Sequence, residues 1–359
     1  MALRVDEHEL GQLKPLAKGG MAEVFDLPDF RIGEHPEWPL VYKRFKKATR
    51  PIPVFGLEAL VKLRDGLHPD QQKAMDQQFN WMVRVVVDGQ NGASGILLPR
   101  LDGTYFTKKY NSYGEVSEGP CEAQNLTATD DFFQRWRIPN PSMEQRFLLC
   151  RSLALGLGKL HRAEVIYGDM SLRNFLYRLE PNVSVMFVDT DAVRPKGGSS
   201  PLGRQPHTGD WEPPEALAAQ RNGNKVGFAI QNFETDRYKL GLAILRILAR
   251  VPRAGETRDP NHIKSVVPSS TFTMLQNSLH GKPADRPLAQ ASLAQARAAI
   301  PEGLPPTHRV FAQWNYVNAA AQAGFDSRDA ARYRDELAPH FGRTAATMPK
   351  VLSGFFVLP

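Results

Sequence analysis

The chain contains little cysteine and no long apolar run, and each shortage excludes a class of protein. Its two cysteines, Cys121 and Cys150, are too few for the disulfide framework of a small secreted domain. The opening MALRVDEHEL carries acidic residues and no apolar segment, so we expect no signal peptide. The longest apolar stretch, 240–251, contains Arg246 and Arg250 and is far shorter than the roughly 20 residues of a membrane span. We therefore expect a cytoplasmic protein with no membrane span.

Extremes of charge and composition are absent as well. Lys and Arg total 45 against 38 Asp and Glu, a net charge of +7 on 359 residues. A surplus this small disfavours nucleic acid as the main partner, and it fits either a binder of anionic phosphates or an ordinary basic surface. The hydrophobic content of 42% excludes disordered, collagen-like and coiled-coil chains. At roughly 150 residues per domain, the length predicts about two domains or lobes.

The first hundred residues read mostly as strands, and the remainder reads as more helical. Segments 13–17 and 23–27 flank a Gly-Gly pair and predict a hairpin with a tight turn. Alternation of apolar residues predicts further strands at 40–45, 81–87 and 95–101. Apolar residues at helical spacing predict one helix at 54–67. Residues 102–127 are polar and predict an irregular interlobe loop or insertion.

In the second half, Ser142 and Gln145 form a capping box that begins a long helix ending near His161. Further elements are expected along the rest of the chain: strands at 174–178 and 184–188, an irregular stretch at 189–215, helix from 237 and a helix pair at 309–323 and 327–340. Loops as long as 189–215 inside a compact domain are usually functional.

The turn between the first two predicted strands contains Gly19 and Gly20. A backbone that closes over phosphate groups must lack side chains at the point of contact, because β-carbons block the amides. A plain hairpin turn explains the same pair. The turn alone therefore leaves both interpretations open.

Lys43 lies on the next predicted strand, between Val41 and Phe45. Alternation half buries it, and a buried ammonium group needs an anionic partner. Glu58, on the helix that follows, is the candidate partner. The alternative is an exposed lysine in a basic run, because Arg44 and Lys46 are close neighbours.

Three oxygen-bearing side chains gather in the stretch LHRAEVIYGDMSLRNFLYRLEPNVSVMFVDTD at 160–191. Asp169 and Asn174 precede a predicted hairpin, and Asp189 follows it, so the hairpin brings them to one end. Such ligands suit Mg²⁺, and a carboxylate not bound to metal can accept the proton of an attacking hydroxyl. Asp191 is either a ligand of a second ion or a turn residue. For each residue alone, a turn or cap role is the simpler explanation.

In this order, the motifs resemble those of the bacterial Ser/Thr protein kinases over about residues 13–298. KGGMAEV resembles the glycine-rich loop, VYKRF the strand of the phosphate-binding lysine, YGDMSLRN the catalytic loop and VDTD the metal-binding triplet. The resemblance implies an α+β, bilobal kinase-like fold. Its parts would be a small antiparallel β-sheet lobe with one helix at 1–101, a larger mostly helical lobe at 102–300 and a helical extension at 301–359.

The resemblance also implies the chemistry. The chain would transfer the γ-phosphate of ATP, with Mg²⁺ or Mn²⁺, to Ser or Thr of a protein substrate and would phosphorylate itself. Asp169 and Lys43 would be catalytic, and the metal ligands would be Asn174, Asp189 and Asp191. The residues that would hold the nucleotide are Ala17, Gly19, Gly20, Val24, Lys43, Glu58, Leu98 and Leu101.

The resemblance continues downstream of these motifs. TGDWEPPE at 208–215 resembles the end of an activation segment, and Arg286 resembles the arginine that pairs with its glutamate, here Glu215. DRYKLG at 236–241 resembles the start of the central buried helix. Thr208 would bond the catalytic aspartate or, like Ser199 and Ser200, accept phosphate.

Several positions depart from the family pattern. Ala17 and Ala22 replace two glycines of the glycine-rich loop, which would make it stiffer. Tyr167-Gly168 stands where the family has His-Arg. Without that arginine no basic pocket receives a phosphate on the activation loop, so we expect activity that does not need loop phosphorylation. Ser171 replaces a lysine that stabilises the transferring phosphoryl group, leaving Arg173 or Lys196 as candidates for that role. The Asp-Thr-Asp triplet resembles a divergent branch, some members of which carry a helix-hairpin-helix module. The helix pair at 309–340 is such a module or a packing extension.

Other activities remain open beside the protein kinase. A pseudokinase that binds nucleotide without transfer fits the missing lysine. A small-molecule kinase or a nucleotidyl transferase would use the same fold. The hypothesis of a nucleic-acid-binding protein is supported only by the net charge and the terminal helix pair. The sequence predicts no oligomeric state.

Overall fold

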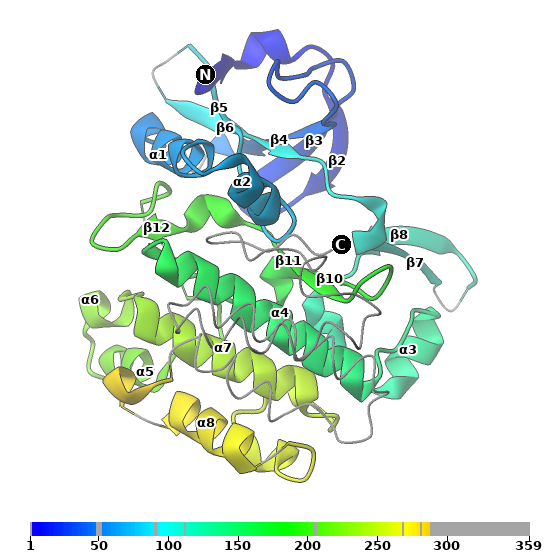
Figure 1. The fold of residues 1–359 in the computed structure, drawn as a ribbon, viewed down its shortest axis with the longest axis vertical. Helices are drawn as coiled ribbons and strands as arrows, with labels where there is room; N and C mark the ends of the chain where they lie inside the picture. The colour runs from blue at the N-terminus through cyan, green and yellow to red at the C-terminus, as the bar shows by residue number, and fades with distance from the viewer. Residues whose placement is uncertain are drawn as a thin grey trace, which may run out of the picture. The chain divides into compact units, whose positions relative to one another are not determined.

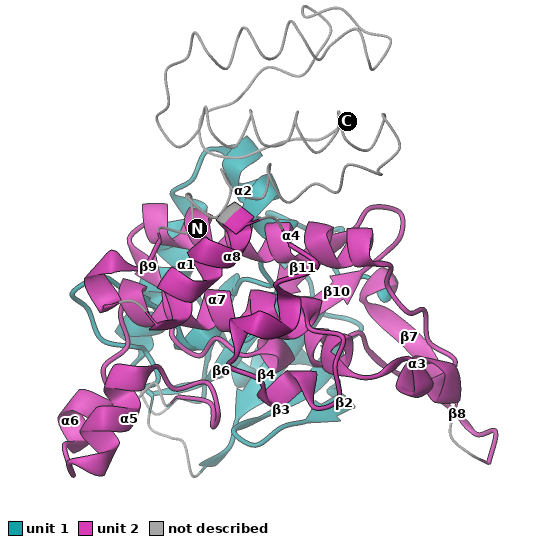
Figure 2. Cartoon of the chain, turned by 90° about the horizontal axis from the view of Figure 1, so that it is seen from below, with its two compact units in different colours: residues 1–103, 187–205 teal, residues 104–186, 206–359 magenta. Residues whose placement is uncertain are grey.

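The computed structural model describes residues 2–47, 52–89, 92–110, 113–203, 207–267, 269–280 and 282–287. The chain divides into two compact units, which Figure 2 colours separately. Unit 1 combines residues 1–103 with 187–205, and unit 2 combines 104–186 with 206 onward. The sequence predicted a division after 101 but not the return of a second segment to unit 1. The predicted extension at 301–359 lies outside the described residues.

Unit 1 contains a six-stranded sheet in the order β1-β5-β6-β4-β3-β2. Its strands are β1 Arg4–Asp6, β2 Lys14–Lys18, β3 Ala22–Leu27, β4 Leu40–Phe45, β5 Arg84–Val87 and β6 Ala93–Pro99 (Figure 1). β1 runs parallel to β5, and the other neighbouring pairs are antiparallel. The predicted hairpin around the glycine pair is confirmed as β2 and β3.

Strand register separates the two faces of this sheet. Phe25, Tyr42 and Leu97 are cross-strand partners, and all three belong to the buried apolar cluster of unit 1. Their neighbours along the strands, Val24 and Lys43, are therefore on the opposite face, because side chains alternate along a strand. The alternation of the sequence thus determines which residues enter the core of the sheet.

Two helices follow β4 in unit 1. They are α1 Val54–Asp65 and α2 Pro69–Asp76, where the sequence predicted one helix over 54–67. His68 caps α2, its ring accepting a hydrogen bond from the backbone N–H of Asp70, and Pro69 occupies the first helical position. The short 3-10 helix η1 Glu7–Leu10 follows β1 and buries Leu10 in the core.

Unit 2 contains two hairpins, separated along the chain by α3 Asp130–Trp136 and α4 Met143–Arg162. The predicted irregular segment 102–127 instead contains η3 Gly103–Tyr105, the paired strands β7 Phe106–Tyr110 and β8 Val116–Pro120, and η4 Ala123–Thr127. These two strands have five residues each, and their mostly polar residues show no clear apolar alternation that would have revealed them in the sequence. The second hairpin consists of β10 Phe175–Arg178 and β11 Ser184–Phe187, close to the predicted spans.

Helices form the rest of unit 2. They are α3 Asp130–Trp136, α4 Met143–Arg162, α5 Pro214–Arg221, α6 Lys225–Phe228, α7 Phe233–Leu248 and α8 Ser269–His280. The capping box of α4 is confirmed, because the Ser142 hydroxyl accepts from the Gln145 backbone N–H and the Gln145 side chain accepts from the Ser142 N–H. Cys150, on the same helix, is a free cysteine and is buried.

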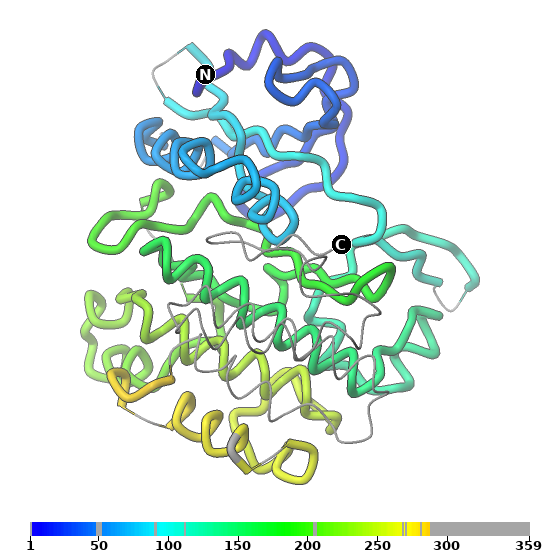
Figure 3. Tube along the Cα trace, viewed as in Figure 1, coloured from blue at the N-terminus to red at the C-terminus, as the bar shows by residue number. Residues whose placement is uncertain are grey.

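Helix α7 packs against both α4 and α8 within unit 2, and Figure 3 shows α4 and α7 side by side along the tube. Most of its residues are buried, including three that carry charge, Asp236, Lys239 and Arg246. A helix that is apolar nearly all round is typically a core helix, so its buried charges require partners. Short 3-10 turns complete the described chain: η5 Leu172–Asn174, η6 Thr190–Ala192, η7 Ala254–Glu256, η8 Pro260–Ile263 and η9 Pro283–Asp285, with the two-residue strands β9 Val165–Ile166 and β12 Arg194–Pro195.

The protein is thus a mixed α and β chain with a small, mostly antiparallel sheet and a set of packed helices. Within the described ranges, none of the helices combines the length and the apolar character needed to cross a bilayer.

Candidate functional site

In unit 1, several of the predicted nucleotide-binding residues share one face of the sheet. Ala17 pairs with Val24, and Val24 pairs with Lys43, so the three lie in one row across β2, β3 and β4. Leu98 pairs with Val41, two residues before Lys43, and so belongs to the same face. Leu101 follows β6 and is half-buried. The register therefore surrounds Lys43 with small and apolar side chains.

The turn between β2 and β3 contains both predicted glycines. It is closed by a hydrogen bond from the Gly19 N–H to the Ala22 carbonyl, 2.8 Å. A β-carbon added at Gly19 would meet only that carbonyl, at 3.4 Å, and one added at Gly20 would meet nothing within 4 Å. The fold of the turn therefore does not require glycine at either position.

Lys43 forms two ion pairs with the segment that returns to unit 1. Its Nζ lies 2.8 Å from Asp189 Oδ1 and 2.7 Å from Asp191 Oδ1. Burial opposes the charged form of Lys43, but the negative charges of Asp191 and Asp189 outweigh it and raise the pKa of Lys43 above its ordinary value. Lys43 is therefore protonated.

The two aspartates differ in exposure. The side chain of Asp191 is 4% exposed, whereas that of Asp189 is 53% exposed. Asp191 is therefore the internal counter-ion of Lys43, and Asp189 is the carboxylate that solvent and ligands can reach. Asp189 also has a left-handed backbone, with φ 54, which is uncommon for a residue other than glycine and clusters at functional sites.

The sequence predicted an ion pair between Lys43 and Glu58, and this prediction was wrong. Glu58, on α1, instead forms an ion pair with Arg4 of β1. The charge of Lys43 is already satisfied by the two aspartates, and β1 supplies a nearer cation to α1. The sequence offered no sign of this, because the three-residue strand β1 is too short to predict.

Residues 78–80 hold the segment that carries both aspartates. The backbone N–H of Asn80 donates to the Phe187 carbonyl, and the Phe187 N–H donates to the Gln78 carbonyl, each at 2.8 Å. The Thr190 hydroxyl donates to the Asn80 carbonyl at 2.8 Å. Thr190 therefore ties the segment that carries both aspartates to the backbone of Asn80.

In unit 2, the loop before η5 brings Asp169 and Asn174 together, as predicted. The Asn174 Nδ2 donates to the Asp169 carbonyl at 2.6 Å and to Asp169 Oδ2 at 3.2 Å. The Thr208 hydroxyl donates to Asp169 Oδ1 at 2.5 Å. Both carboxylate oxygens of Asp169 are therefore oriented, and the hydrogen bond expected between Thr208 and Asp169 is present.

Asp236, at the start of α7, anchors this loop from below. Its fully buried carboxylate accepts from the backbone N–H groups of Tyr167 and Gly168, at 2.8 and 2.9 Å, and contacts His161 Nε2 at 3.1 Å. Gly168 has φ 77, a conformation that favours glycine. The anchor fixes the backbone immediately before Asp169.

Lys239 was missed by the sequence reasoning. Its buried Nζ donates to the Gly168 carbonyl at 2.5 Å and to Gln231 Oε1 at 2.8 Å. Burial lowers the pKa of Lys239 to about 8, although the charges of Asp236 and Asp169 oppose the shift. A signal existed in the sequence, since an aspartate and a lysine three residues apart in an apolar helix must each find a partner.

A second predicted pair closes the segment before α5. Arg286 Nη1 and Nη2 each lie 2.7 Å from an oxygen of Glu215, so the pair is bidentate. Arg286 also donates to the Glu234 carbonyl at 3.0 Å. The pairing that the resemblance implied for these two residues is confirmed.

The predicted residues thus form two groups, one in each unit. Unit 1 holds Lys43 with Asp189 and Asp191, and unit 2 holds Asp169 with Asn174. In the parts of the chain that the structure describes, no three His, Cys, Asp or Glu side chains gather as a ready metal cluster. Comparison of the chain with models of known protein families found no match, and comparison with curated proteins found none either.

Proposed function

We propose that the chain is an ATP-dependent protein kinase that phosphorylates Ser or Thr hydroxyls, built on a bilobal kinase-like fold. The observation that carries the proposal is the pair between Lys43 and Asp189, two residues 146 positions apart. A half-buried lysine beside a reachable carboxylate offers a cation for phosphate oxygens and an anion for the metal that accompanies them.

The glycine turn supports nucleotide binding. Gly19 and Gly20 are not required by the turn itself, so a ligand that approaches its backbone amides supplies the missing reason for them. The face formed by Ala17, Val24 and Leu98 offers a small, apolar surface of the kind that an adenine ring packs against.

A divalent cation fits the donor atoms that remain. Asn174 uses its amide nitrogen on Asp169, so its oxygen is the atom left for a cation, and Asp189 offers an exposed carboxylate. Mg²⁺ or Mn²⁺ prefers such oxygen ligands and takes its remaining ligands from phosphates and water. When bound, the ion neutralises phosphate charge. The candidate ligand in unit 1 is Asp189, with Asp191 as the counter-ion of Lys43. The candidate ligand in unit 2 is Asn174.

Asp169 is assigned the role of positioning the acceptor and taking its proton. The oxygen of a Ser or Thr hydroxyl forms the new bond to the γ-phosphorus of ATP, the bond from that phosphorus to the bridging oxygen breaks, and ADP leaves. The hydroxyl proton passes to the Asp169 carboxylate, which Asn174 and Thr208 hold in orientation. Catalysis is then mainly positioning and charge stabilisation.

The test is phosphoryl transfer with Mg²⁺ and ATP, read by intact mass on the chain itself and on a generic Ser/Thr protein. We expect Asp169→Asn to keep nucleotide binding and lower transfer by about 10²–10⁴-fold. Asp130→Asn, a carboxylate of α3 in the same unit, is the control and should retain full transfer. Addition of AMP instead of phosphate would assign a nucleotidyl transferase, and wild-type transfer by Asp169→Asn would refute the assigned role.

A nucleotide-binding protein without transfer is the second candidate, favoured by Ser171. This buried residue stands where the resemblance implies a lysine that stabilises the moving phosphoryl group. If wild type binds ATP but modifies neither itself nor any protein or small-molecule acceptor, the second candidate replaces the first.

A further inference from the structure

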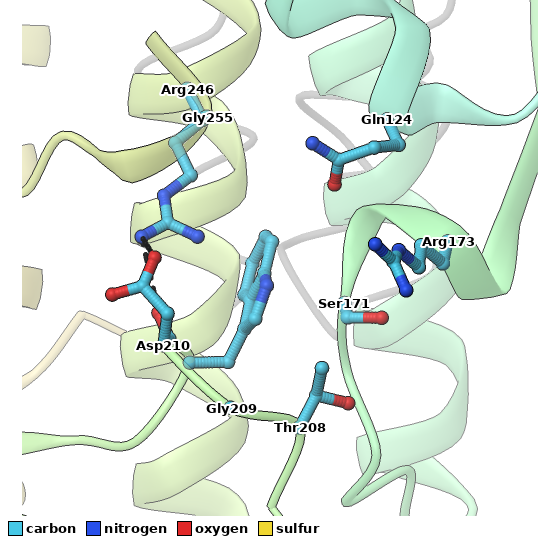
Figure 4. A pocket seen from close by; sticks show the side chains of 9 residues that line it. Gln124, Ser171, Arg173, Thr208, Gly209, Asp210, Arg246 and Gly255 are labelled. Carbon is cyan, nitrogen blue, oxygen red and sulfur yellow. Dashed lines mark hydrogen bonds and ion pairs between the residues drawn. The ribbon is translucent and has the colours of Figure 1, made fainter. Parts of the chain in front are cut away.

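A pocket of about 290 Å³ lies within unit 2, next to the proposed base. Thr208, one of its lining residues, donates a hydrogen bond directly to Asp169, and Ser171, another, lies two residues after Asp169. Figure 4 shows Ser171 and Arg173 across this pocket from Asp210 and Arg246. The volume is at the lower limit of small-molecule pockets, about 300 Å³, so it suits a side chain of a bound segment better than a nucleotide.

The carboxylate of the pocket is already neutralised. Asp210 Oδ2 lies 2.7 Å from Arg246 Nη2, and its Oδ1 lies 3.4 Å from Arg258 Nη2. Arg246 is 1% exposed and also donates to the Asp210 and Thr257 carbonyls. Because these groups are occupied by one another, this wall offers little net charge to a ligand.

Arg173 is in the opposite situation. It is exposed, it lines the pocket, and among the described residues it has no carboxylate or carbonyl partner. Its guanidinium group is always charged and presents several N–H donors in one plane. The neighbouring lining groups are neutral and polar, namely the Gln124 amide and the Ser171 and Thr208 hydroxyls. The surplus charge of the pocket is therefore positive and comes from Arg173.

We propose that this pocket binds an acidic side chain, Asp or Glu, next to the Ser or Thr that the enzyme phosphorylates, and that Arg173 reads it. The inference rests on the proposed function, because the pocket gains its meaning from Asp169 beside it. The enzyme would then prefer substrate segments with acidic residues next to the acceptor over segments with basic residues there. The inference also separates Arg173 from the alternative role of stabilising the transferring phosphoryl group.

The experiment compares three peptides that carry one acceptor Ser and differ only in the flanking residues, which are Glu, Gln or Lys. We expect the KM of wild type for the Glu peptide to be about ten-fold lower than for the Gln peptide, with the Lys peptide worst. Arg173→Gln should remove the difference in KM between the Glu and Gln peptides. Arg173→Glu should favour the Lys peptide.

Arg135→Gln is the matched control. Arg135 is also an exposed arginine of unit 2, on α3, and it does not line the pocket. We expect this variant to keep the full preference for the Glu peptide. A loss of preference in Arg135→Gln would show a general surface-charge effect and overturn the assignment to Arg173.

A binding measurement separates this inference from the proposed function. Fluorescence anisotropy of the labelled Glu and Gln peptides on wild type without nucleotide requires no transfer. Tighter binding of the Glu peptide, lost in Arg173→Gln, supports the pocket even if transfer is never observed, whereas transfer with equal use of all three peptides overturns the pocket alone. An equal fall of kcat for every peptide in Arg173→Gln would assign Arg173 to the phosphoryl group instead. Tighter binding of a phosphoserine peptide than of the Glu peptide would overturn the carboxylate.

Discussion

At the scale of single residues, the charges of this protein matter through what they are paired with. Lys43 in unit 1 lies between two carboxylates, of which Asp191 is buried and Asp189 is exposed. Burying such a group is costly unless it is paired, and removing one partner leaves the other charge uncompensated. By the same rule Arg246 differs from Arg173, because Arg246 pairs with Asp210 and Arg173 has no carboxylate partner among the described residues.

Replacement of Lys43 tests this pairing. Lys43→Met leaves Asp191 buried without its counter-ion, so we expect unfolding free energy to fall by about 3 kcal/mol and phosphoryl transfer to be lost. Urea denaturation gives the first quantity and the transfer assay the second. Lys62→Met, on the exposed face of α1, should change neither. Unchanged stability in Lys43→Met would contradict a buried ion pair.

Substitution in the glycine turn separates binding from folding. Gly20→Ala meets nothing within 4 Å, so we expect unfolding free energy to stay within about 0.5 kcal/mol of wild type. If the turn closes over phosphates, the added methyl group should raise the KM for ATP several-fold. Thermal shift without nucleotide and steady-state kinetics give the two values. A variant with unaltered KM would return the turn to a plain hairpin.

At the scale of elements, the loop from Tyr167 to Asn174 is held by buried side chains of helix α7 as well as by hydrogen bonds within the loop. Asp236 accepts two of its backbone N–H groups, and Lys239 binds the Gly168 carbonyl. Asp236 and Lys239 both lie on α7 and are buried, so their side chains have little freedom to move. Residues supported in this way hold a catalytic group within a narrow geometry.

The pair between Arg286 and Glu215 anchors α5 in the same manner. Arg286→Gln should lower unfolding free energy by about 2–3 kcal/mol, because it breaks a bidentate pair whose arginine is 1% exposed in its side chain. Arg286→Lys should lose less unfolding free energy than Arg286→Gln but should not match wild type, because an ammonium group cannot form the two parallel bonds of the planar guanidinium group. A double-mutant cycle with Glu215→Gln isolates the coupling.

The control for this pair is Arg253 with Glu256, whose side chains are 79% and 63% exposed. Removal of an exposed pair is expected to cost less than about 1 kcal/mol. Equal costs for the two pairs would mean that the anchor of α5 is not the bidentate contact.

At the scale of the whole molecule, the chain builds two units but does not build them in order. Unit 1 is completed by residues 187–205, after 83 residues of unit 2 have intervened, 104–186. Asp189 and Asp191 reach Lys43 only through this return. Folding of unit 1 therefore depends on a segment distant in sequence, and the Lys43 pairs join its two parts.

The pH dependence of stability is a property of the whole molecule. Burial, helped by the charge of Lys239, lowers the pKa of His207 to about 4 from its ordinary 6.5. Between these values the unfolded chain binds more protons than the folded one, so stability is full above about pH 6.5 and is lost as pH falls toward 4. Because one proton is involved, the loss is at most about 1.4 kcal/mol per pH unit.

Thermal denaturation from pH 4 to pH 7.5 checks this window. His207→Phe keeps an aromatic ring beside Phe228, 5.5 Å away between ring centroids in wild type, but cannot take up a proton. We expect its stability curve to be flatter than that of wild type below pH 6.5. Parallel curves for the two proteins would refute the shift of His207.

Much of the local structure follows from local patterns. Alternation in β2, β3 and β4, the capping box of α4 and the apolar character of α7 each depend on residues close in the chain. The pairs of Asp169 with Asn174 and of Glu215 with Arg286 were also expected, the second from the kinase resemblance. The hairpin of β7 and β8 and the short strand β1 were not, because a few polar alternating residues give no clear period.

By itself, the sequence determined which chemical groups the protein carries, in what order, and which strand face or helix holds them, since these depend on short-range periodicity. Only the tertiary structure decided the partners of several other charged groups. Arg4 took Glu58, Asp189 and Asp191 took Lys43, and Asp210 took Arg246 while Arg173 was left exposed. The physical reason is that a charge pairs with whatever opposite charge the packing brings within a few ångströms, and sequence spacing does not encode that distance.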